Sequence, residues 1–270
     1  MTRKKISRFL SFLLVSVMLF TVYNCNAAAS SEDWPEGWQR FELPIGSTNS
    51  SSYTMPYWVY TPADLKPGLP LVVYLHSTGG MFKSALRERE SGLPTMIISG
   101  DVPSPEAIVL VPQHPGTDED DSWEMFLNPV IACVEQVIEE YQPDPSRIAL
   151  VGFSLGGVGM WNLAAALPGV FSRLLCIEGR VIRKMRHPEY FEGCEVRLYT
   201  AYRDMSVNTA SAVNFVAALN EAGIPATHFE MKNSHAEIPK IVFTDEEVQE
   251  WLWLRNNEKE TPDPVTDPVQ

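Results

Sequence analysis

Basic residues are scarce in this sequence. It has 21 lysines and arginines against 34 aspartates and glutamates, and its formal net charge is −13 at pH 7. Proteins that bind nucleic acids place a basic face on the phosphates, so this charge argues against such a partner. The remaining composition is ordinary for a globular protein, and 270 residues favour one domain with a sizeable core.

Cysteine is also rare, with four in the chain. No two of them have the spacing of a metal site. Apart from Cys25 near the N-terminus, the chain holds Cys133, Cys176 and Cys194, and this odd number allows at most one disulfide. Cys176 and Cys194 are the candidates for it, but three buried, unpaired thiols are at least as good an interpretation.

Long apolar runs are limited to one, from Phe9 to Val22, and two serines interrupt it. A membrane-spanning helix needs about 20 apolar residues, so we expect no stable membrane anchor. Basic residues precede the run and small residues ending in Ala28 and Ala29 follow it, which is typical of a secretory signal peptide. We expect residues 1–29 to be cleaved off and the protein to be secreted or periplasmic.

A lipoprotein anchored through Cys25 is the alternative to simple cleavage. Asn24 stands before this cysteine, where such processing prefers a small residue. Removal of residues 1–29 takes away basic residues only, which leaves a net charge of about −17 on the mature chain. An acidic surface suits a soluble exported protein.

Between residues 30 and 255, short β-rich apolar runs alternate with helical patterns. This alternation predicts an α/β fold with a mostly parallel sheet and helices on both faces. Runs such as LVVYL, residues 71–75, are apolar at every position, as in strands covered on both sides. The expected strands are 40–45, 56–62, 69–76, 107–113, 147–153, 173–179, 195–202 and 226–232, with the first two antiparallel.

The expected helices are 128–141, 156–167, 208–223 and 244–255, the last with Thr244 as its N-cap. We find neither an internal repeat nor a linker between domains, so residues 30–255 form one expected domain. Residues 256–270 are charged, contain three prolines and have little apolar content, which favours a disordered tail.

The segment Gly152-Phe153-Ser154-Leu155-Gly156 matches G-x-S-x-G. In a nucleophile elbow with this pattern, a strand turns sharply into a helix and presents the serine above the sheet. Glycines flank the turn because it is strained and crowded. Here the serine follows an all-apolar strand and precedes a helical run, so Ser154 is the candidate nucleophile.

A serine nucleophile needs a base, and the base needs an acid that orients it. His235 lies in the loop between the last strand and the last helix, where the base is expected. His228 falls inside a predicted strand, and His187 comes too early in the chain. Asp204 ends the strand at 195–202 and is the preferred acid, while Glu178, one strand earlier, is its competitor.

Backbone N–H groups must stabilise the negative charge on the substrate oxygen. One such donor is normally the residue after the nucleophile, here Leu155. The other is expected from the loop His76-Ser77-Thr78-Gly79-Gly80, whose small residues allow close approach to a ligand. An ordinary glycine turn is the alternative for this loop.

Together, PLVVYLHSTGG, RIALVGFSLGGVGMWNLAAALPGVF, RDMSV and SHAEI resemble the α/β-hydrolase superfamily over residues 55–240. Within it they look most like the secreted esterases grouped with polyhydroxybutyrate depolymerases, feruloyl esterases and phospholipase/carboxylesterase-like "predicted peptidases". The residues that this resemblance implies are the nucleophile Ser154, the acid Asp204, the base His235, the oxyanion donors Leu155 and Thr78, and Trp123 near the substrate cleft. The chain departs from the family at His76-Ser77, where His-Gly is usual.

The expected activity is hydrolysis of carboxylic esters through an acyl-enzyme, without a cofactor or a metal. Since the pocket and not the fold decides the substrate, feruloyl or acetyl esters on carbohydrate are a preferred class only. A serine peptidase is the alternative within the fold. A binding protein with a vestigial site is the alternative from another class, and it predicts an unreactive Ser154.

Overall fold

The structure is a computed structural model that describes residues 34–47, 52–81, 84–88, 91–116, 122–181, 187–202 and 209–253. The expected signal peptide, the lipoprotein alternative at Cys25, the expected tail and the predicted acid Asp204 lie outside these ranges. Export and tail disorder therefore stay predictions. Within the ranges, no helix is both long and apolar enough to cross a bilayer.

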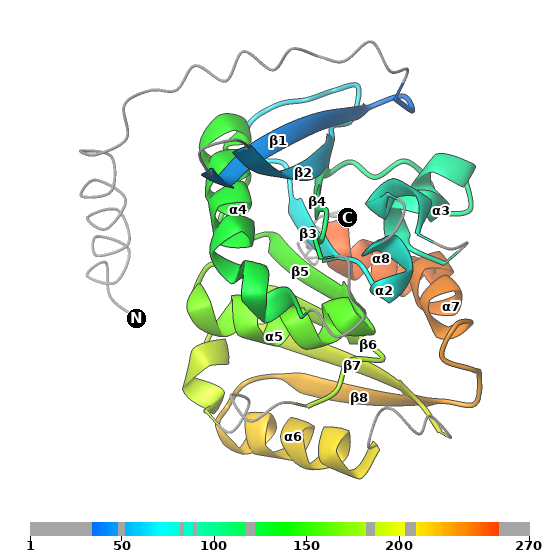
Figure 1. The fold of residues 1–270 in the computed structure, drawn as a ribbon. Helices are drawn as coiled ribbons and strands as arrows, with labels where there is room; N and C mark the ends of the chain where they lie inside the picture. Colours follow the sequence, from blue (N-terminus) through cyan, green and yellow to red (C-terminus); the bar gives the residue numbers. More distant parts are fainter. Residues whose placement is uncertain are drawn as a thin grey trace, which may run out of the picture. The chain divides into compact units, whose positions relative to one another are not determined.

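A sheet of eight strands forms the centre of the molecule, in the order β1-β2-β4-β3-β5-β6-β7-β8 (Figure 1). β1 pairs antiparallel with β2, β2 pairs antiparallel with β4, and every other neighbouring pair is parallel. The strands are β1 (Trp38–Ser47), β2 (Ser52–Tyr60), β3 (Leu71–Leu75), β4 (Ile108–Pro112), β5 (Ile148–Phe153), β6 (Arg173–Ile177), β7 (Glu195–Ala201) and β8 (Ala226–Met231). All eight expected strands are present, and the antiparallel start is confirmed.

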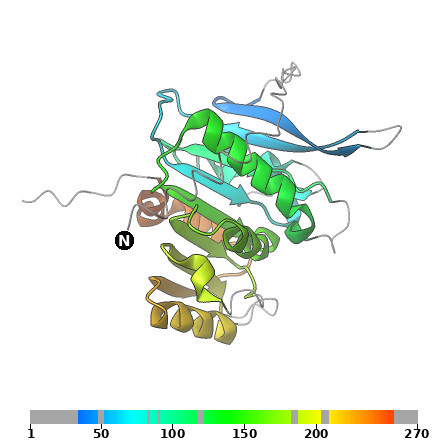
Figure 2. The same cartoon turned by 90° about the vertical axis from the view of Figure 1, so that its left-hand side faces the viewer.

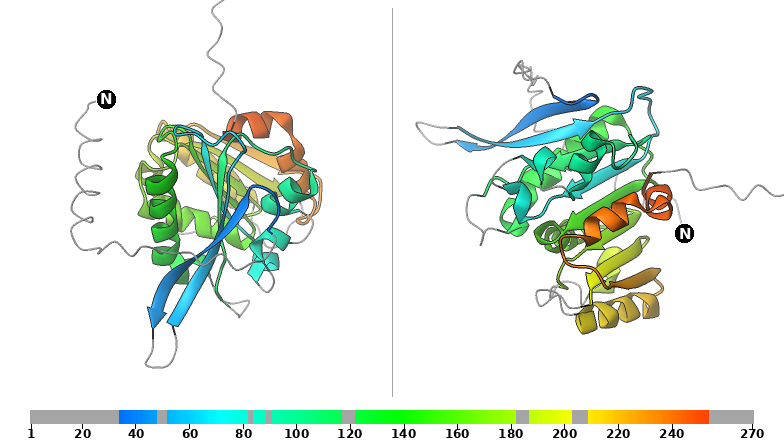
Figure 3. Two further views of the ribbon diagram at one scale, coloured as in Figure 1. Left: turned by 90° about the horizontal axis from the view of Figure 1, so that it is seen from above. Right: turned by 90° about the vertical axis from the view of Figure 1, so that its right-hand side faces the viewer.

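Helices cover both faces of this sheet. They are α2 (Thr78–Met81), α3 (Leu93–Ser99), α4 (Leu127–Tyr141), α5 (Leu155–Ala166), α6 (Thr209–Glu221), α7 (Ile238–Thr244) and α8 (Glu246–Trp253). Short 3-10 turns lie at Ala85–Arg87, Trp123–Phe126 and Pro188–Phe191. Figure 2 looks onto the side of α4, α5 and α6, and the right panel of Figure 3 onto the side of α3, α7 and α8.

β3 shows how the sequence produces these two layers. Leu71, Val73 and Leu75 belong to the core shared with α4, α5 and α6. Val72 and Tyr74 belong to the core shared with α3, α7 and α8. Successive side chains of a strand point to opposite faces, so an uninterrupted apolar run fills both cores. The expected α/β fold is confirmed.

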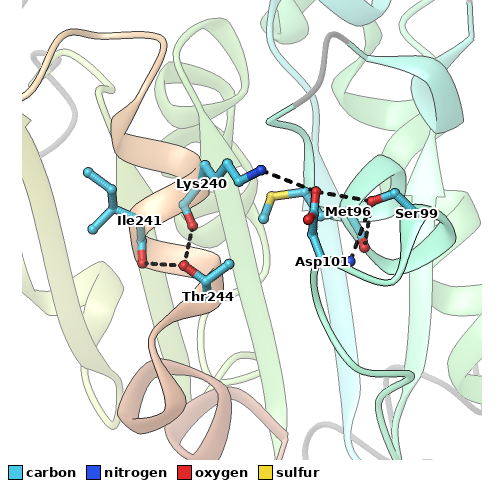
Figure 4. Close-up of polar contacts among 6 residues, drawn as sticks. All are labelled: Met96, Ser99, Asp101, Lys240, Ile241 and Thr244. Carbon is cyan, nitrogen blue, oxygen red and sulfur yellow. Dashed lines mark hydrogen bonds and ion pairs between the residues drawn. The ribbon is translucent and has the colours of Figure 1, made fainter.

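The C-terminal helical region differs from the prediction of a single helix with Thr244 as its N-cap. Thr244 ends α7, and its hydroxyl donates to the carbonyls of Lys240 (2.8 Å) and Ile241 (3.3 Å), as Figure 4 shows. Asp245 is the residue before α8, and its carboxylate accepts the N–H of Glu247 (2.9 Å). The side chain of Asp245 reaches the new helix, while that of Thr244 turns back to the preceding one.

Figure 4 also shows how α7 is connected to the segment after α3. The ammonium of Lys240 lies 3.3 Å from a carboxylate oxygen of Asp101, which also accepts a hydrogen bond from the hydroxyl of Ser99 (3.2 Å). The Lys240 and Asp101 side chains are about half exposed, so water screens this ion pair and its contribution to stability is small.

Cys133, Cys176 and Cys194 are buried and free. The candidate disulfide between Cys176 and Cys194 is therefore absent, and the interpretation as three apolar thiols holds. The Cys176 thiol lies 3.5 Å from the carbonyl oxygen of Gly157, and that of Cys194 lies 3.1 Å from the carbonyl oxygen of Phe171. Each of these two thiols thus has a backbone acceptor.

Candidate active site

The candidate residues gather at the carboxyl edge of the parallel strands. Residues 76–80 follow β3, Ser154 follows β5, Glu178 follows β6, and His235 follows β8. Because these strands are parallel, their carboxyl ends meet at one edge of the sheet, where open α/β folds bind their ligands. The topology therefore brings together segments that are far apart in sequence.

Ser154 has the backbone of a strained turn. Its φ of 53° and ψ of −112° are unusual for any residue except glycine, and α5 begins directly after it. Its N–H donates to the carbonyl of Ile177 on β6 (2.8 Å). A side chain at Gly152 would collide with the carbonyl of Gly156, so the tight turn requires glycine there. The backbone at Ser154 therefore has the strained strand-to-helix turn that the sequence pattern predicts.

His235 lies beside this elbow. Its ring packs against the ring of Phe153, the residue before Ser154, with centroids 5.4 Å apart. The loop that carries it is closed by Glu237, whose carboxylate accepts both the N–H (2.9 Å) and the hydroxyl (2.7 Å) of Ser234. These bonds lower the pKa of Glu237 below its usual value, so it stays ionised and holds the loop at neutral pH. The side chain of His235 is 37% exposed and can be reached from solvent.

Glu178 provides a carboxylate next to this histidine. Its Oε2 lies 3.3 Å from Nδ1 of His235, and its side chain is completely buried. Glu178 also has a positive φ, 55°, and its N–H donates to the carbonyl of Tyr199 on β7 (2.9 Å). The competing acid is thus in contact with the predicted base, whereas the preferred acid, Asp204, falls outside the described residues.

The other two histidines downstream of Ser154 lie where the sequence indicates. His228 belongs to β8, and its Nε2 lies 2.8 Å from the hydroxyl of Thr200 on β7. His187 is exposed and lies 3.0 Å from the carboxylate of Glu189. Among the described residues, neither of them contacts the turn at Ser154, so His235 remains the candidate base.

The two predicted oxyanion donors each begin a helix. Leu155 is the first residue of α5, and Thr78 is the first residue of α2. The two segments touch, since a side chain at Gly156 would collide with the carbonyl of Leu75 and come close to that of His76. Helix N-termini expose unpaired N–H groups, which suits both positions to a developing negative charge.

The buried ring of His76 holds the loop after β3, residues 76–80, through two hydrogen bonds. Its Nε2 accepts the N–H of His114 (3.0 Å), so Nδ1 carries the proton and donates to the carbonyl of Ser77 (2.7 Å). Burial lowers the pKa of His76 to about 4, which keeps the ring neutral at physiological pH. The usual His-Gly of the family is replaced by His76-Ser77, and the histidine still organises the loop.

Trp123 is buried beside the loop after β3. It is 2% exposed, its indole N–H donates to the carbonyl of His76 (3.2 Å), and its ring packs against those of His76 and His114. A side chain at Gly159 on α5 would collide with it. This tryptophan supports the loop from inside, and its expected place near the substrate cleft stays a prediction.

Sequence reasoning missed two polar residues that hold the same loop. Gln113 donates to the carbonyl of Gly80 (2.9 Å) and accepts the N–H of Ala85 (2.7 Å). Glu88 is 1% exposed and accepts the N–H of Ser77 (2.5 Å). Glu88 stands in the charged stretch RERE, which is typical of a solvated surface, so the sequence carries no signal for its burial.

Comparison with known proteins supports the assignment of the fold. No protein-family model matches the chain. The carboxylesterase NlhH of Mycobacterium tuberculosis is 34% identical over 120 residues, which are 42% of this chain and 33% of NlhH. The chain thus spans about a third of the length of the curated relatives that it matches.

Three solved structures illustrate the structural likeness. A thermostable esterase has a TM-score of 0.62 at 23% identity, covering 80% of this chain and 62% of its own. The feruloyl esterase module of Clostridium thermocellum, complexed with sinapinate, has a TM-score of 0.58 at 12% identity and covers 84% and 92%. The acylaminoacyl peptidase of Pyrococcus horikoshii has a TM-score of 0.57 at 12% identity and covers 83% and 43%. The chain has the α/β-hydrolase fold.

Proposed function

We propose that the protein is a serine hydrolase that cleaves carboxylic esters. The observation that carries this proposal is the positive φ of Ser154 on a strand-to-helix turn, with the ring of His235 against the preceding residue. Proteins keep such backbone strain mainly at functional sites. The esterases among the sequence and structure relatives point to the same class of reaction.

The mechanism that fits this geometry is acyl transfer in two steps. His235 removes the proton from Ser154 as the hydroxyl attacks the ester carbonyl, and the N–H groups of Leu155 and Thr78 stabilise the resulting oxyanion. His235 then gives the proton to the leaving alcohol. Water attacks the acyl-enzyme with His235 again as the base, which releases the acid and restores the serine.

A carboxylate must keep His235 in the productive tautomer. We assign this role to Asp204, which follows β7 in the chain order expected for the fold. Glu178 adds a second, buried carboxyl group, whose Oε2 lies 3.3 Å from Nδ1. The substrate class that we propose, acyl groups such as feruloyl or acetyl on carbohydrate, rests on resemblance alone.

The first test is hydrolysis of p-nitrophenyl acetate by the purified protein and its Ser154→Ala variant. We expect the variant to lose at least about 10³-fold in kcat, because removal of a serine nucleophile leaves only the binding contribution. Ser146→Ala is the matched control, since this exposed serine lies just before β5 at the opposite edge of the sheet. Equal activity of wild type and Ser154→Ala would refute the proposal.

A fluorophosphonate probe extends this test to a selective enzyme that ignores p-nitrophenyl acetate. Wild type and Ser146→Ala should be labelled at Ser154, and Ser154→Ala should not be labelled. A wild-type protein that neither hydrolyses the ester nor takes the label would favour a binding protein on this fold. Faster cleavage of an acylated peptide than of aryl and feruloyl esters would favour a peptidase.

A further inference from the structure

In the loop at residues 76–80, here called the oxyanion loop, three N–H groups have an acceptor in the structure. The N–H of Gly79 donates to the hydroxyl of Ser77 (3.1 Å), and that of Gly80 donates to the carbonyl of Ser77 (3.0 Å). The N–H of Ser77 donates to Glu88 (2.5 Å). The amide of Thr78 donates to none of the residues that the structure describes, and Thr78 is partly exposed.

Glu88 holds the loop from a position 11 residues after Ser77. One carboxylate oxygen accepts the Ser77 N–H, and the other accepts the hydroxyl of Tyr74 (2.6 Å), which is fully buried on β3. The hydroxyl of Thr95 on α3 donates to the carbonyl of Glu88 (2.8 Å) and fixes its backbone. Both oxygens of the carboxyl group therefore have a donor, and hydrogen bonds hold both the side chain and the backbone of Glu88.

The hydrogen bonds of Glu88 partly compensate for the burial of its carboxyl group. Burial raises the pKa of Glu88 above its usual value, and the hydrogen bonds from Ser77 and Tyr74 offset only part of this rise. Burial and the nearby Glu88 raise the pKa of Tyr74 well above its usual value, so the hydroxyl keeps its proton and remains a donor. A buried carboxylate is costly unless it is hydrogen-bonded, and these two donors provide what it needs.

We propose that Glu88 is a positioning residue for the reaction: by holding the Ser77 N–H, it leaves the Thr78 N–H as the donor that the oxyanion loop presents to the substrate oxygen. This inference rests on the proposed function. Without Glu88, the Ser77 N–H would lack an acceptor in a buried site, and the loop would turn to find one. The Thr78 N–H would then leave the position at which it meets the oxyanion.

The test uses two substitutions of similar size. Glu88→Met removes the acceptor, whereas Glu88→Gln keeps one amide oxygen for the Ser77 N–H and lets the amide NH₂ donate to Tyr74. We expect Glu88→Met to lose about 10- to 100-fold in kcat with KM changed less than about threefold, because oxyanion donors act on the transition state. Glu88→Gln should retain kcat within about threefold, and so should Glu139→Met, a matched control at an exposed glutamate of α4.

Amide hydrogen exchange, measured by NMR, provides a readout that does not depend on activity. The Ser77 N–H should exchange at least about tenfold faster in Glu88→Met than in wild type and Glu88→Gln. The proposal is overturned if Glu88→Met keeps the kcat of wild type or if its defect is a higher KM at unchanged kcat. It is also overturned if the kcat of Glu88→Gln falls as far as that of Glu88→Met. If Glu88→Met does not fold, rapid exchange of the Ser77 N–H in wild type overturns it.

The two proposals fail in different ways. A wild type that is inactive and unlabelled by fluorophosphonate, yet protects its Ser77 N–H, refutes the proposed function and the catalytic role of Glu88 but not its hold on the loop. An active wild type in which Glu88→Met is equally active refutes the role of Glu88 and leaves the proposed function intact.

Discussion

Nδ1 of His235 lies 3.3 Å from Oε2 of Glu178, whose side chain is completely buried at the end of β6. Glu178 follows β6, whereas Asp204, the acid that the chain order favours, follows β7. The carboxyl group beside the candidate base thus comes from one strand earlier. The close packing of Gly157 on α5 against Gly179 makes this arrangement possible, because a side chain at either glycine would collide with the other's backbone. The segment that carries Glu178 is thereby held against the elbow helix.

The relative importance of Glu178 and Asp204 can be measured with isosteric amides. We expect Asp204→Asn to lower kcat about 10³- to 10⁴-fold, the effect of losing the residue that sets the histidine tautomer. Glu178→Gln should lower kcat only about tenfold, because our proposal assigns the orienting hydrogen bond to Asp204.

Steady-state kinetics of both variants between pH 5 and 9 show which of the two carboxyl groups acts as the acid. Glu189→Gln, at an exposed glutamate, is the control. The reverse ranking, with Glu178→Gln the more damaged variant, would assign the acid to Glu178. The same loss in both would mean that the two carboxylates act as one unit.

The fold was predictable because its signals are local. Runs such as 71–75 are apolar at every position, which only a strand between two helical layers explains, and the elbow glycines flank Ser154 within five residues. The burial of Glu88 and Trp123 was not predictable, because it depends on backbone partners, the N–H of Ser77 and the carbonyl of His76, that no sequence pattern identifies. Helix α7 was not predicted, and α8 was expected to begin one residue early, since Thr244 and Asp245 are both good capping residues.

Gly156 should tolerate no side chain. In the structure a Cβ at this position would overlap the carbonyl of Leu75, so Gly156→Ala must push the elbow away from the oxyanion loop. We expect a loss of about 1 to 3 kcal/mol in the free energy of unfolding, as for other overpacked sites, together with a large fall in kcat. Urea denaturation and ester hydrolysis measure the two effects.

Gly46→Ala is the matched control for this substitution. Gly46 lies on β1, and a Cβ there would meet no atom within 4 Å. The control should keep both stability and activity. Wild-type kinetics in Gly156→Ala would mean that the contact between elbow and loop has no part in positioning the oxyanion donors.

The three cysteines should behave as buried thiols. Burial raises the pKa of all three, that of Cys194 to about 12, so none carries a reactive thiolate at neutral pH. Without reductant, the folded protein lacking residues 1–29 should react slowly with Ellman's reagent, and the denatured protein should release three equivalents. One equivalent after denaturation would reveal a disulfide between Cys176 and Cys194 and contradict the structure.

Protonation of His76 should make stability depend on pH. Burial lowers the pKa of this histidine from 6.5 to about 4 in the folded protein, whereas the unfolded chain has the ordinary value. Between these two values the unfolded state binds more protons, so the free energy of unfolding falls as the pH decreases from 6.5 to 4. The shift corresponds to a loss of about 3 kcal/mol from this group alone.

Urea denaturation at pH 7.0 and pH 4.5 measures this loss when the protein is compared with His76→Asn. The asparagine keeps a donor for the carbonyl of Ser77 but has no group that titrates, so the variant should be less stable at pH 7.0 and should lose less on acidification. His187→Asn, at an exposed histidine, controls for the substitution itself. Carboxylates elsewhere in the chain titrate in all three proteins. Only the difference between wild type and His76→Asn in the stability lost from pH 7.0 to pH 4.5 therefore reports on His76. An equal loss of stability in wild type and His76→Asn would show that this ring is already protonated or accessible to solvent. The network through His114 and Trp123 would then not hold the oxyanion loop as the structure describes.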